Sequence, residues 1–243
     1  MKLLYYAIIT VIIIFIFYCV NIFLSKKEYF APIDVQPINN NFIPKIIHQT
    51  APADKAKWNE VWYKCQESWF EKFPSPEYEY KMWTDEDLDS LIKNDFPWFY
   101  DIYSNYDVNI KRIDIARYFI LYKYGGIYAD MDYMCINNFY DLLPPEKVSI
   151  SESPHTQNEY IQNALMASNK NNNFWLKVID ESKNRINDSV FNATGPNLVS
   201  DIYFANKNDV NILEKNLFNP LRESSEFNDD KIYSKHFGSC SYC

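Results

Sequence analysis

The stretch RIDIARYFILYKYGGIYADMD, residues 112–132, joins an almost wholly apolar helical pattern to two adjacent glycines and two aspartates one residue apart. We expect the helix to begin near Asn105 or Asp107 and to end at Gly125, because glycine tolerates the left-handed backbone that commonly ends a helix. Apolar residues lie on more than one face, so the helix is predicted to be buried nearly all round. The glycines therefore mark a sharp turn from a buried helix into a central strand.

Two charged residues within this predicted helix need a partner. Asp114 and Arg117 are three residues apart and share a face, and charged side chains are hardly ever fully buried unless they are paired or bound to something. One interpretation is an internal ion pair that satisfies itself. The other is a pair that binds a ligand, and the sequence pattern alone favours neither.

The two aspartates follow the apolar residues 127–129. Residues i and i+2 of a strand point to the same side, so Asp130 and Asp132 are expected to present two carboxylates on one face. Like charges so close raise each other's pKa unless a cation lies between them. Hard carboxylate oxygens suit Mg²⁺ or Mn²⁺, and the pair predicts a divalent-metal site at the end of a central strand.

The sequence before this stretch predicts an α/β domain with a mainly parallel sheet. Residues 42–50 and 78–83 are typical of short strands, and residues 57–73 carry tryptophans at helical spacing. Thr84 opens a capping-box-like start of a further helix. Strands that alternate with helices in this way are typical of parallel sheets flanked by helices.

The sequence after the aspartates is less regular. Residues 147–151 are typical of a short strand, whereas residues 160–168 and 174–186 are expected to form helices. Beyond Gly195 the pattern determines the secondary structure poorly.

Residues 3–24 carry no charge. As a helix this run spans roughly 33 Å, enough to cross a bilayer, so we predict a transmembrane anchor. A cleaved signal peptide is the alternative, but its apolar stretch is about 7–15 residues long and ends in small residues. The expected organisation is an anchor at residues 1–24, a stem at 25–41 and a catalytic domain at 42–243.

Composition narrows the class of ligand. The net charge of −8 over 243 residues argues against nucleic acid as a partner, because binding to a phosphate backbone relies on clustered Lys and Arg. The four glycines form neither a G-x-G-x-x-G motif nor a Walker loop. A phosphorylated ligand must therefore be neutralised mainly by a metal and by side chains, as in a metal-dependent enzyme that acts on a nucleoside diphosphate sugar.

Four stretches resemble glycosyltransferase family 32, which includes fungal Golgi α-mannosyltransferases, inositol phosphoceramide mannosyltransferases and glycolipid α-galactosyltransferases. They are IPKIIHQT, YKMWTDEDL, RIDIARYFILYKYGGIYADMD and GPN, and the likeness runs from about residue 43 to the C-terminus. The long central motif is similar to the sugar-binding region that contains a DXD motif. The resemblance implies a Rossmann-like GT-A fold, a nucleotide-sugar donor (GDP- or UDP-hexose), dependence on Mn²⁺ or Mg²⁺, and retention of anomeric configuration.

The resemblance also implies roles for the charged residues of the central motif. Asp130 and Asp132 would be the catalytic DXD pair. Asp130 would contact the ribose or the sugar near the metal, and Asp132 would bind the metal directly. Asp114 and Arg117 match an Asp and an Arg that hold the donor sugar and diphosphate.

Further site residues come from the flanking motifs. Gln49, Thr50, Tyr128 and Asn197 are assigned to donor binding by the same resemblance. Family members often end in a His-rich stretch followed by Gly-Ser-Trp, and here the matching segment is KHFGSCSYC. His236 is therefore expected to assist at the metal or the diphosphate, although the Trp is absent.

The leading hypothesis is a membrane-anchored retaining glycosyltransferase that transfers a hexose, with mannose as first choice, to a glycan or glycolipid. Its expected topology is single-pass type II, with the catalytic domain in the lumen of the Golgi or endoplasmic reticulum. A nucleotidyltransferase or phosphohydrolase is a second hypothesis, but it would need a third carboxylate and usually a phosphate loop that the sequence lacks. A membrane-tethered glycan-binding or scaffold protein with a degenerate site is the non-enzymatic alternative, supported by the altered C-terminus.

Overall fold

The computed structural model describes residues 42–155, 160–221 and 231–238. The predicted anchor at residues 1–24 and the stem at 25–41 lie outside the described residues. Within the described ranges, no helix combines the length and the apolar character needed to span a bilayer.

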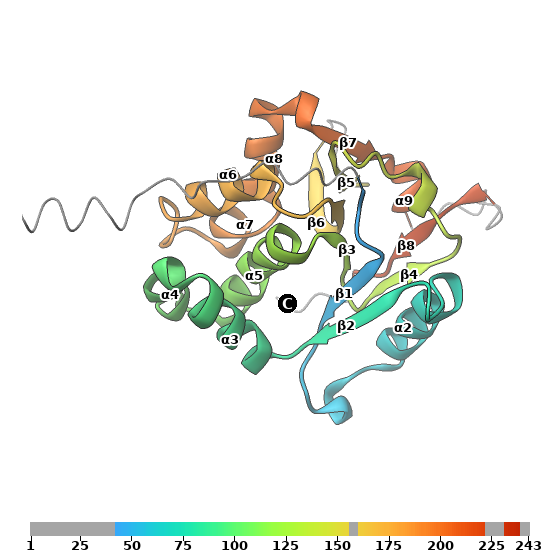
Figure 1. Cartoon of the computed structure of the whole chain (residues 1–243), viewed down its shortest axis with the longest axis horizontal. Helices are drawn as coiled ribbons and strands as arrows, with labels where there is room; N and C mark the ends of the chain where they lie inside the picture. The colour runs from blue at the N-terminus through green and yellow to red at the C-terminus, as the bar shows by residue number, and fades with distance from the viewer. Residues whose placement is uncertain (1–41, 156–159, 222–230, 239–243) are drawn as a thin grey trace, which may run out of the picture. The chain divides into compact units, whose positions relative to one another are not determined.

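The described residues form a six-stranded sheet with the order β2-β1-β3-β6-β5-β7 (Figure 1). Strand β1 pairs in parallel with β2 and β3, and β5 pairs in parallel with β7, whereas β6 runs antiparallel to β3 and β5. The sheet is thus mainly parallel, as predicted, with one inverted strand near its centre. The strands are β1 (Ile46–Thr50), β2 (Glu79–Trp83), β3 (Gly126–Ala129), β5 (Val148–Glu152), β6 (Ile161–Ser168) and β7 (Val210–Leu213).

Strand β6 shows that the prediction of a helix at residues 160–168 is wrong. Its Ala, Leu and Met residues are good helix formers, but the segment lies between β3 and β5 and is buried on both faces. A strand covered on both faces has a continuous apolar run rather than an alternating one. Because such a run does not separate a strand from a buried helix, the pattern was ambiguous.

Helices cover both faces of the sheet (Figure 1). Side chains from α3, α4, α5, α6 and α8 share one hydrophobic cluster with one face, and those from α2 and α9 share another with the opposite face. The second cluster also includes β4 (Tyr133–Cys135), which pairs with β8 (Ser234–His236). The helices are α2 (Glu60–Lys72), α3 (Asp85–Asp95), α4 (Pro97–Ser104), α5 (Asn109–Tyr124), α6 (Asn173–Ser182), α7 (Val190–Ala193), α8 (Pro196–Ala205) and α9 (Lys215–Phe218), with 3₁₀ turns η1 (Lys55–Lys57), η2 (Tyr140–Leu142) and η3 (Lys207–Asp209).

Helix α5 is buried along most of its length, as predicted. It begins at Asn109, later than expected, because residues 97–104 form the separate helix α4 and the chain turns between the two. It ends at Gly125, whose φ is +64°, and Gly126 follows with a φ of +95°. Both glycines adopt backbone conformations that residues with a side chain rarely occupy, which explains why the pair stands there.

His48 fixes β1 to this glycine turn. Its Nε2–H donates to the carbonyl of Gly125 at 2.9 Å, and its Nδ1 accepts from the indole N–H of Trp83 at 3.2 Å. The ring is fully buried. Burial and, to a smaller extent, the charge of Lys81 lower the pKa of His48 from 6.5 to about 3.

This pKa shift predicts a loss of stability in mild acid. Between pH 6.5 and 3 the unfolded chain binds a proton at His48 that the folded chain rejects, so the free energy of unfolding falls as the pH falls. The contribution reaches about 1.4 kcal/mol per pH unit. Urea unfolding at pH 7 and pH 5 should therefore show a smaller acid-induced loss for His48→Gln than for the parent chain. An equal loss in both proteins would contradict the assignment.

Candidate active site

A cavity of about 570 Å³ opens where β1, β2 and β3 end. Its walls come from the segments that follow these strands, from one face of α5, from the first residues of β6, and from α7, α8 and β8. Ligands of open α/β sheets bind at the carboxyl ends of the strands, so this cavity is the candidate site. Five predicted residues line it: Thr50, Arg117, Asp130, Asp132 and His236.

The two aspartates lie in a turn rather than within a strand. Strand β3 ends at Ala129, and the N–H of Tyr133 donates to the carbonyl of Asp130 at 2.9 Å to close the turn into β4. The expectation that the pleat of a strand aligns the two carboxylates is therefore corrected. They come together because the chain reverses between β3 and β4.

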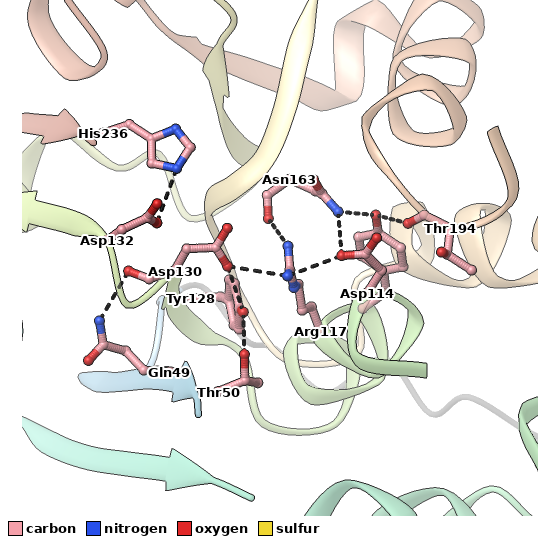
Figure 2. A network of polar contacts seen from close by, with 11 residues as sticks. Gln49, Thr50, Asp114, Arg117, Tyr128, Asp130, Asp132, Asn163, Thr194 and His236 are labelled. Atoms are coloured by element: carbon pink, nitrogen blue, oxygen red, sulfur yellow. Dashed lines mark hydrogen bonds and ion pairs between the residues drawn. The ribbon is translucent and has the colours of Figure 1, made fainter. Parts of the chain in front are cut away.

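The pairing of β4 with β8 brings a third potential ligand to this turn. Tyr133 lies opposite His236 in the ladder, and His236 Nε2 is 3.2 Å from Asp132 Oδ1 (Figure 2). One ligand atom each from Asp130, Asp132 and His236 can be chosen so that all three lie within 4.8 Å of one another. Two carboxylates and an imidazole fit a divalent cation such as Mn²⁺.

The electrostatics of Asp130 are consistent with a cation at this point. Burial raises the pKa of Asp130; Arg117 opposes this shift, and the neighbouring charge of Asp132 adds to it. A positive ion between the two carboxylates would remove their mutual repulsion and favour the ionised form of both.

Asp130 is held by side chains behind it. The hydroxyl of Tyr128 donates to Asp130 Oδ1 at 2.9 Å, and Thr50 Oγ1 lies 2.9 Å from the same hydroxyl (Figure 2). A phenol has one proton to donate, so Thr50 donates to Tyr128 in turn. Tyr128 is fully buried and does not line the cavity, which makes it a support for Asp130.

Removing this support should weaken metal binding. Tyr128→Phe keeps the buried ring and deletes the hydroxyl that orients Asp130. Loss of such an outer partner typically costs 10–100-fold in metal affinity or activity. A Mn²⁺ titration of the variant should therefore saturate at about 10-fold or more higher metal concentration. Unchanged metal dependence would show that the Tyr128 hydroxyl has no positioning role.

The ion pair on α5, Asp114 and Arg117, is linked to Asp130. Arg117 Nη2 lies 3.1 Å from Asp114 Oδ1 and 3.4 Å from Asp130 Oδ1. Asp114 is fully buried and is not a lining residue, whereas Arg117 reaches the cavity. The internal ion pair is therefore present and places its arginine at the cavity, and ligand binding by the pair stays a prediction.

Asn163 completes this network, and sequence analysis missed it. Its backbone carbonyl accepts from Arg117 Nη1 at 3.3 Å. Its side-chain Nδ2 donates to Asp114 Oδ1 at 3.4 Å and to the Tyr118 hydroxyl at 3.1 Å. It lies on β6, where Gln162 and Ala164 also line the cavity. No local motif marks Asn163, and its position depends on the pairing of β6 with β3.

Two other predicted donor-binding residues lie behind or beside the cavity. Gln49 is fully buried, and its Nε2 donates to the carbonyl of Asp130 at 3.3 Å. Asn197, in the first turn of α8, accepts from the Tyr160 hydroxyl and donates to Asn192 Oδ1 at 2.6 Å. Neither is among the described residues that line the cavity, and their roles stay predictions.

Comparison with known proteins identifies this region. Residues 59–150 match the family described as "Glycosyltransferase sugar-binding region containing DXD motif", and this span includes α5 and both aspartates. The chain therefore carries a glycosyltransferase region, and the resemblance to DXD-motif glycosyltransferases is confirmed.

Two fungal proteins are similar in sequence to this chain. Inositol phosphoceramide mannosyltransferase 3 of Schizosaccharomyces pombe is 42% identical over 137 residues, which cover 56% of this chain and 36% of that protein. Mannosyl phosphorylinositol ceramide synthase CSH1 of Saccharomyces cerevisiae is 33% identical over 205 residues, which cover 82% of this chain and 51% of that protein. The chain thus spans about half or less of the length of these relatives.

Solved structures confirm the fold. The structure titled "PaToxG Glycosyltransferase" superposes with a TM-score of 0.54 at 18% identity, covering 67% of this chain and 69% of that one. At this identity the likeness shows the fold alone. The domain has a GT-A-like fold, with a mainly parallel central sheet and helices on both faces.

Proposed function

From the glycosyltransferase region and the cavity built on it, we propose that this protein is a divalent-metal-dependent, retaining hexosyltransferase. It takes a hexose, with mannose as first choice, from a nucleotide sugar and transfers it to a glycolipid or glycan hydroxyl. The observation that carries the proposal is the convergence of Asp130, Asp132 and His236 on one point beside Arg117. Mannose and a glycolipid are preferred because the names of the similar fungal proteins include mannosyltransferase and inositol phosphoceramide.

In the proposed reaction, different residues around the cavity bind different parts of the donor. Asp130, Asp132 and His236 would hold Mn²⁺, and the bound ion would offset negative charge on the departing diphosphate. Arg117 adds a fixed positive charge on the same side. The side-chain amide of Asn163 holds Asp114 and its backbone carbonyl holds Arg117. The charges near the transferred sugar are thus oriented before the donor arrives.

The proposal includes membrane attachment. The uncharged run at residues 3–24 would anchor the chain in type II orientation, with residues 25–41 as the stem and the catalytic domain in the lumen. Protease protection of the catalytic domain in sealed microsomes is the expected outcome, and digestion of this domain in intact vesicles would contradict the orientation.

The activity is tested by screening donors with the full chain in detergent and Mn²⁺. Release of free nucleotide should depend on a glycolipid or glycan acceptor and should stop when a chelator removes the metal. The anomeric configuration of the product, read by NMR, should match that of the donor. Binding of a nucleotide sugar without turnover across a broad acceptor panel would favour the glycan-binding alternative, and turnover that survives metal removal would overturn the metal role.

A further inference from the structure

Thr194 carries a buried hydroxyl that the fold does not use. The residue is fully buried, and its Oγ1 has no hydrogen-bond partner among the described residues. Its backbone groups are both paired, because the N–H donates to the carbonyl of Val190 at 3.2 Å and the carbonyl accepts from the Tyr118 hydroxyl at 2.6 Å. Burial of a hydroxyl without a partner costs free energy. This hydroxyl therefore needs an explanation that lies outside the packing of the fold.

The sequence around Thr194 supplies such an explanation. Asn192, Ala193 and Thr194 form the triplet Asn-x-Ser/Thr, which is the acceptor signature for N-linked glycans. The signature requires a hydroxyl two residues after the asparagine and excludes proline between them. A glycan is transferred to such a triplet while the chain is being made, so the hydroxyl is needed before the fold closes over it.

Asn192 itself remains accessible in the folded chain. It lies on the short helix α7 and is exposed, whereas the hydroxyl-bearing residue of its triplet is buried. Residues that carry a glycan lie on the surface, because the glycan is bulky and hydrated. The fold can therefore accommodate a glycan on Asn192 after it has buried Thr194.

Hydrogen bonds orient the side-chain amide of Asn192 with its nitrogen free. The Tyr160 hydroxyl donates to Asn197 Oδ1, and Asn197 Nδ2 donates to Asn192 Oδ1 at 2.6 Å. The protein thus holds the oxygen of Asn192, which accepts. Its Nδ2, the atom to which a glycan is attached, makes no hydrogen bond to the described part of the chain.

A second acceptor triplet lies a few residues earlier. Asn187, Asp188 and Ser189 are all exposed in the connection between α6 and α7. An exposed serine hydroxyl bonds to water, so nothing distinguishes Ser189 from an ordinary surface serine. The unused buried hydroxyl is found at Asn192 and not at Asn187.

We propose that Asn192 carries an N-linked glycan. The assignment rests on the lumenal placement in the proposed function, because the transfer takes place in the lumen. The amide nitrogen of Asn192 forms a bond to the anomeric carbon of an oligosaccharide that is carried on a lipid diphosphate. The bond from that carbon to the diphosphate breaks, the lipid diphosphate leaves, and one amide proton is released. The glycan stands at the rim of the cavity, next to Phe191, which lines the cavity and is 51% exposed.

The test is digestion of the full chain, expressed in eukaryotic cells, with an enzyme that removes N-linked glycans. All variants carry Asn187→Gln, so that Asn192 is the remaining acceptor of the sequence. The Asn187→Gln chain should gain electrophoretic mobility by the mass of one glycan, and adding Asn192→Gln or Thr194→Val should abolish this shift. Adding Thr194→Ser, which keeps the hydroxyl, should retain it. A shift that survives the loss of Asn192 or of the Thr194 hydroxyl would overturn the assignment.

Asn184→Gln is the matched control. Asn184 is exposed in the same connection and belongs to no acceptor triplet, so its replacement should leave the shift intact. Thr194→Val should also leave the urea midpoint of the full chain made in bacteria unchanged or raise it, because the lost hydroxyl has no partner. A lower midpoint would overturn the premise that the fold leaves this hydroxyl unused.

Protease protection separates this proposal from the function on which it rests. If the Asn187→Gln chain shows no shift although its catalytic domain is protected in sealed microsomes, glycosylation of Asn192 is overturned and the lumenal orientation stands. Digestion of the catalytic domain in intact vesicles would overturn the orientation and the glycosylation together.

Discussion

Replacing Asp132 by asparagine is expected to lower hexose transfer about 100- to 1000-fold. The substitution keeps the shape of a buried side chain that lies 3.2 Å from His236 and within reach of Asp130, but it removes one negative charge from the proposed metal site. A bound metal contributes several kcal/mol to stabilising charge in the transition state, and each 1.36 kcal/mol corresponds to a tenfold change in rate. Initial rates of nucleotide release at saturating Mn²⁺ measure the effect.

Asp141→Asn supplies the control for this prediction. Asp141 lies on η2, is exposed and does not line the cavity, so its loss should change the rate less than twofold. An Asp132→Asn enzyme with more than about a third of the parent rate would show that Asp132 does not bind a catalytic metal. Full rescue by raising Mn²⁺ would instead confine its role to metal affinity.

Gly126→Ala is expected to lower the free energy of unfolding by about 2–5 kcal/mol. The added Cβ would lie 2.4 Å from the carbonyl oxygen of Ile46, which belongs to the neighbouring strand β1. Forced overpacking costs about 1–3 kcal/mol, and a side chain at the φ of +95° adds roughly 1–2 kcal/mol. Because β1 is locked between β2 and β3, the contact cannot relax without opening the sheet.

Gly238→Ala separates the two contributions to this loss. Gly238 has a φ of +57°, and a Cβ there would meet nothing within 4 Å. It should therefore lose only the backbone part, about 1–2 kcal/mol. Urea unfolding followed by circular dichroism measures both variants. Equal losses for the two substitutions would mean that the contact with Ile46 is relieved in solution.

Features encoded within one segment were predictable from the sequence. Helix α5, its glycine end and the strand that follows depend on periodicity and on the special conformations of Gly125 and Gly126. The two aspartates could also be singled out as candidate metal ligands, because two carboxylates one residue apart repel each other unless a cation lies between them. Their geometry could not, since the turn from β3 to β4 and the approach of His236 depend on pairing with β8, about 100 residues later in the chain.

Features that depend on strand pairing were not predictable. The apolar run at residues 160–168 could be a helix or a strand covered on both sides, and only its neighbours β3 and β5 decide. Asn163 was missed for the same reason. The residue pattern alone, without the family resemblance, left the role of Arg117 open, because its second partner, Asp130, lies on a different element.

The inversion of β6 has a consequence for local motion. Residues 162–164 reach the cavity from within a strand, where the N–H of Asp130 donates to the carbonyl of Ala164 at 2.9 Å and Arg117 holds the carbonyl of Asn163. Pro52 and Asp85 stand at the other end, on segments that have left the sheet. Segments outside the sheet open more readily than those held in a ladder. Amide hydrogen exchange should therefore be slow at residues 162–164 and faster in the segments that follow β1 and β2.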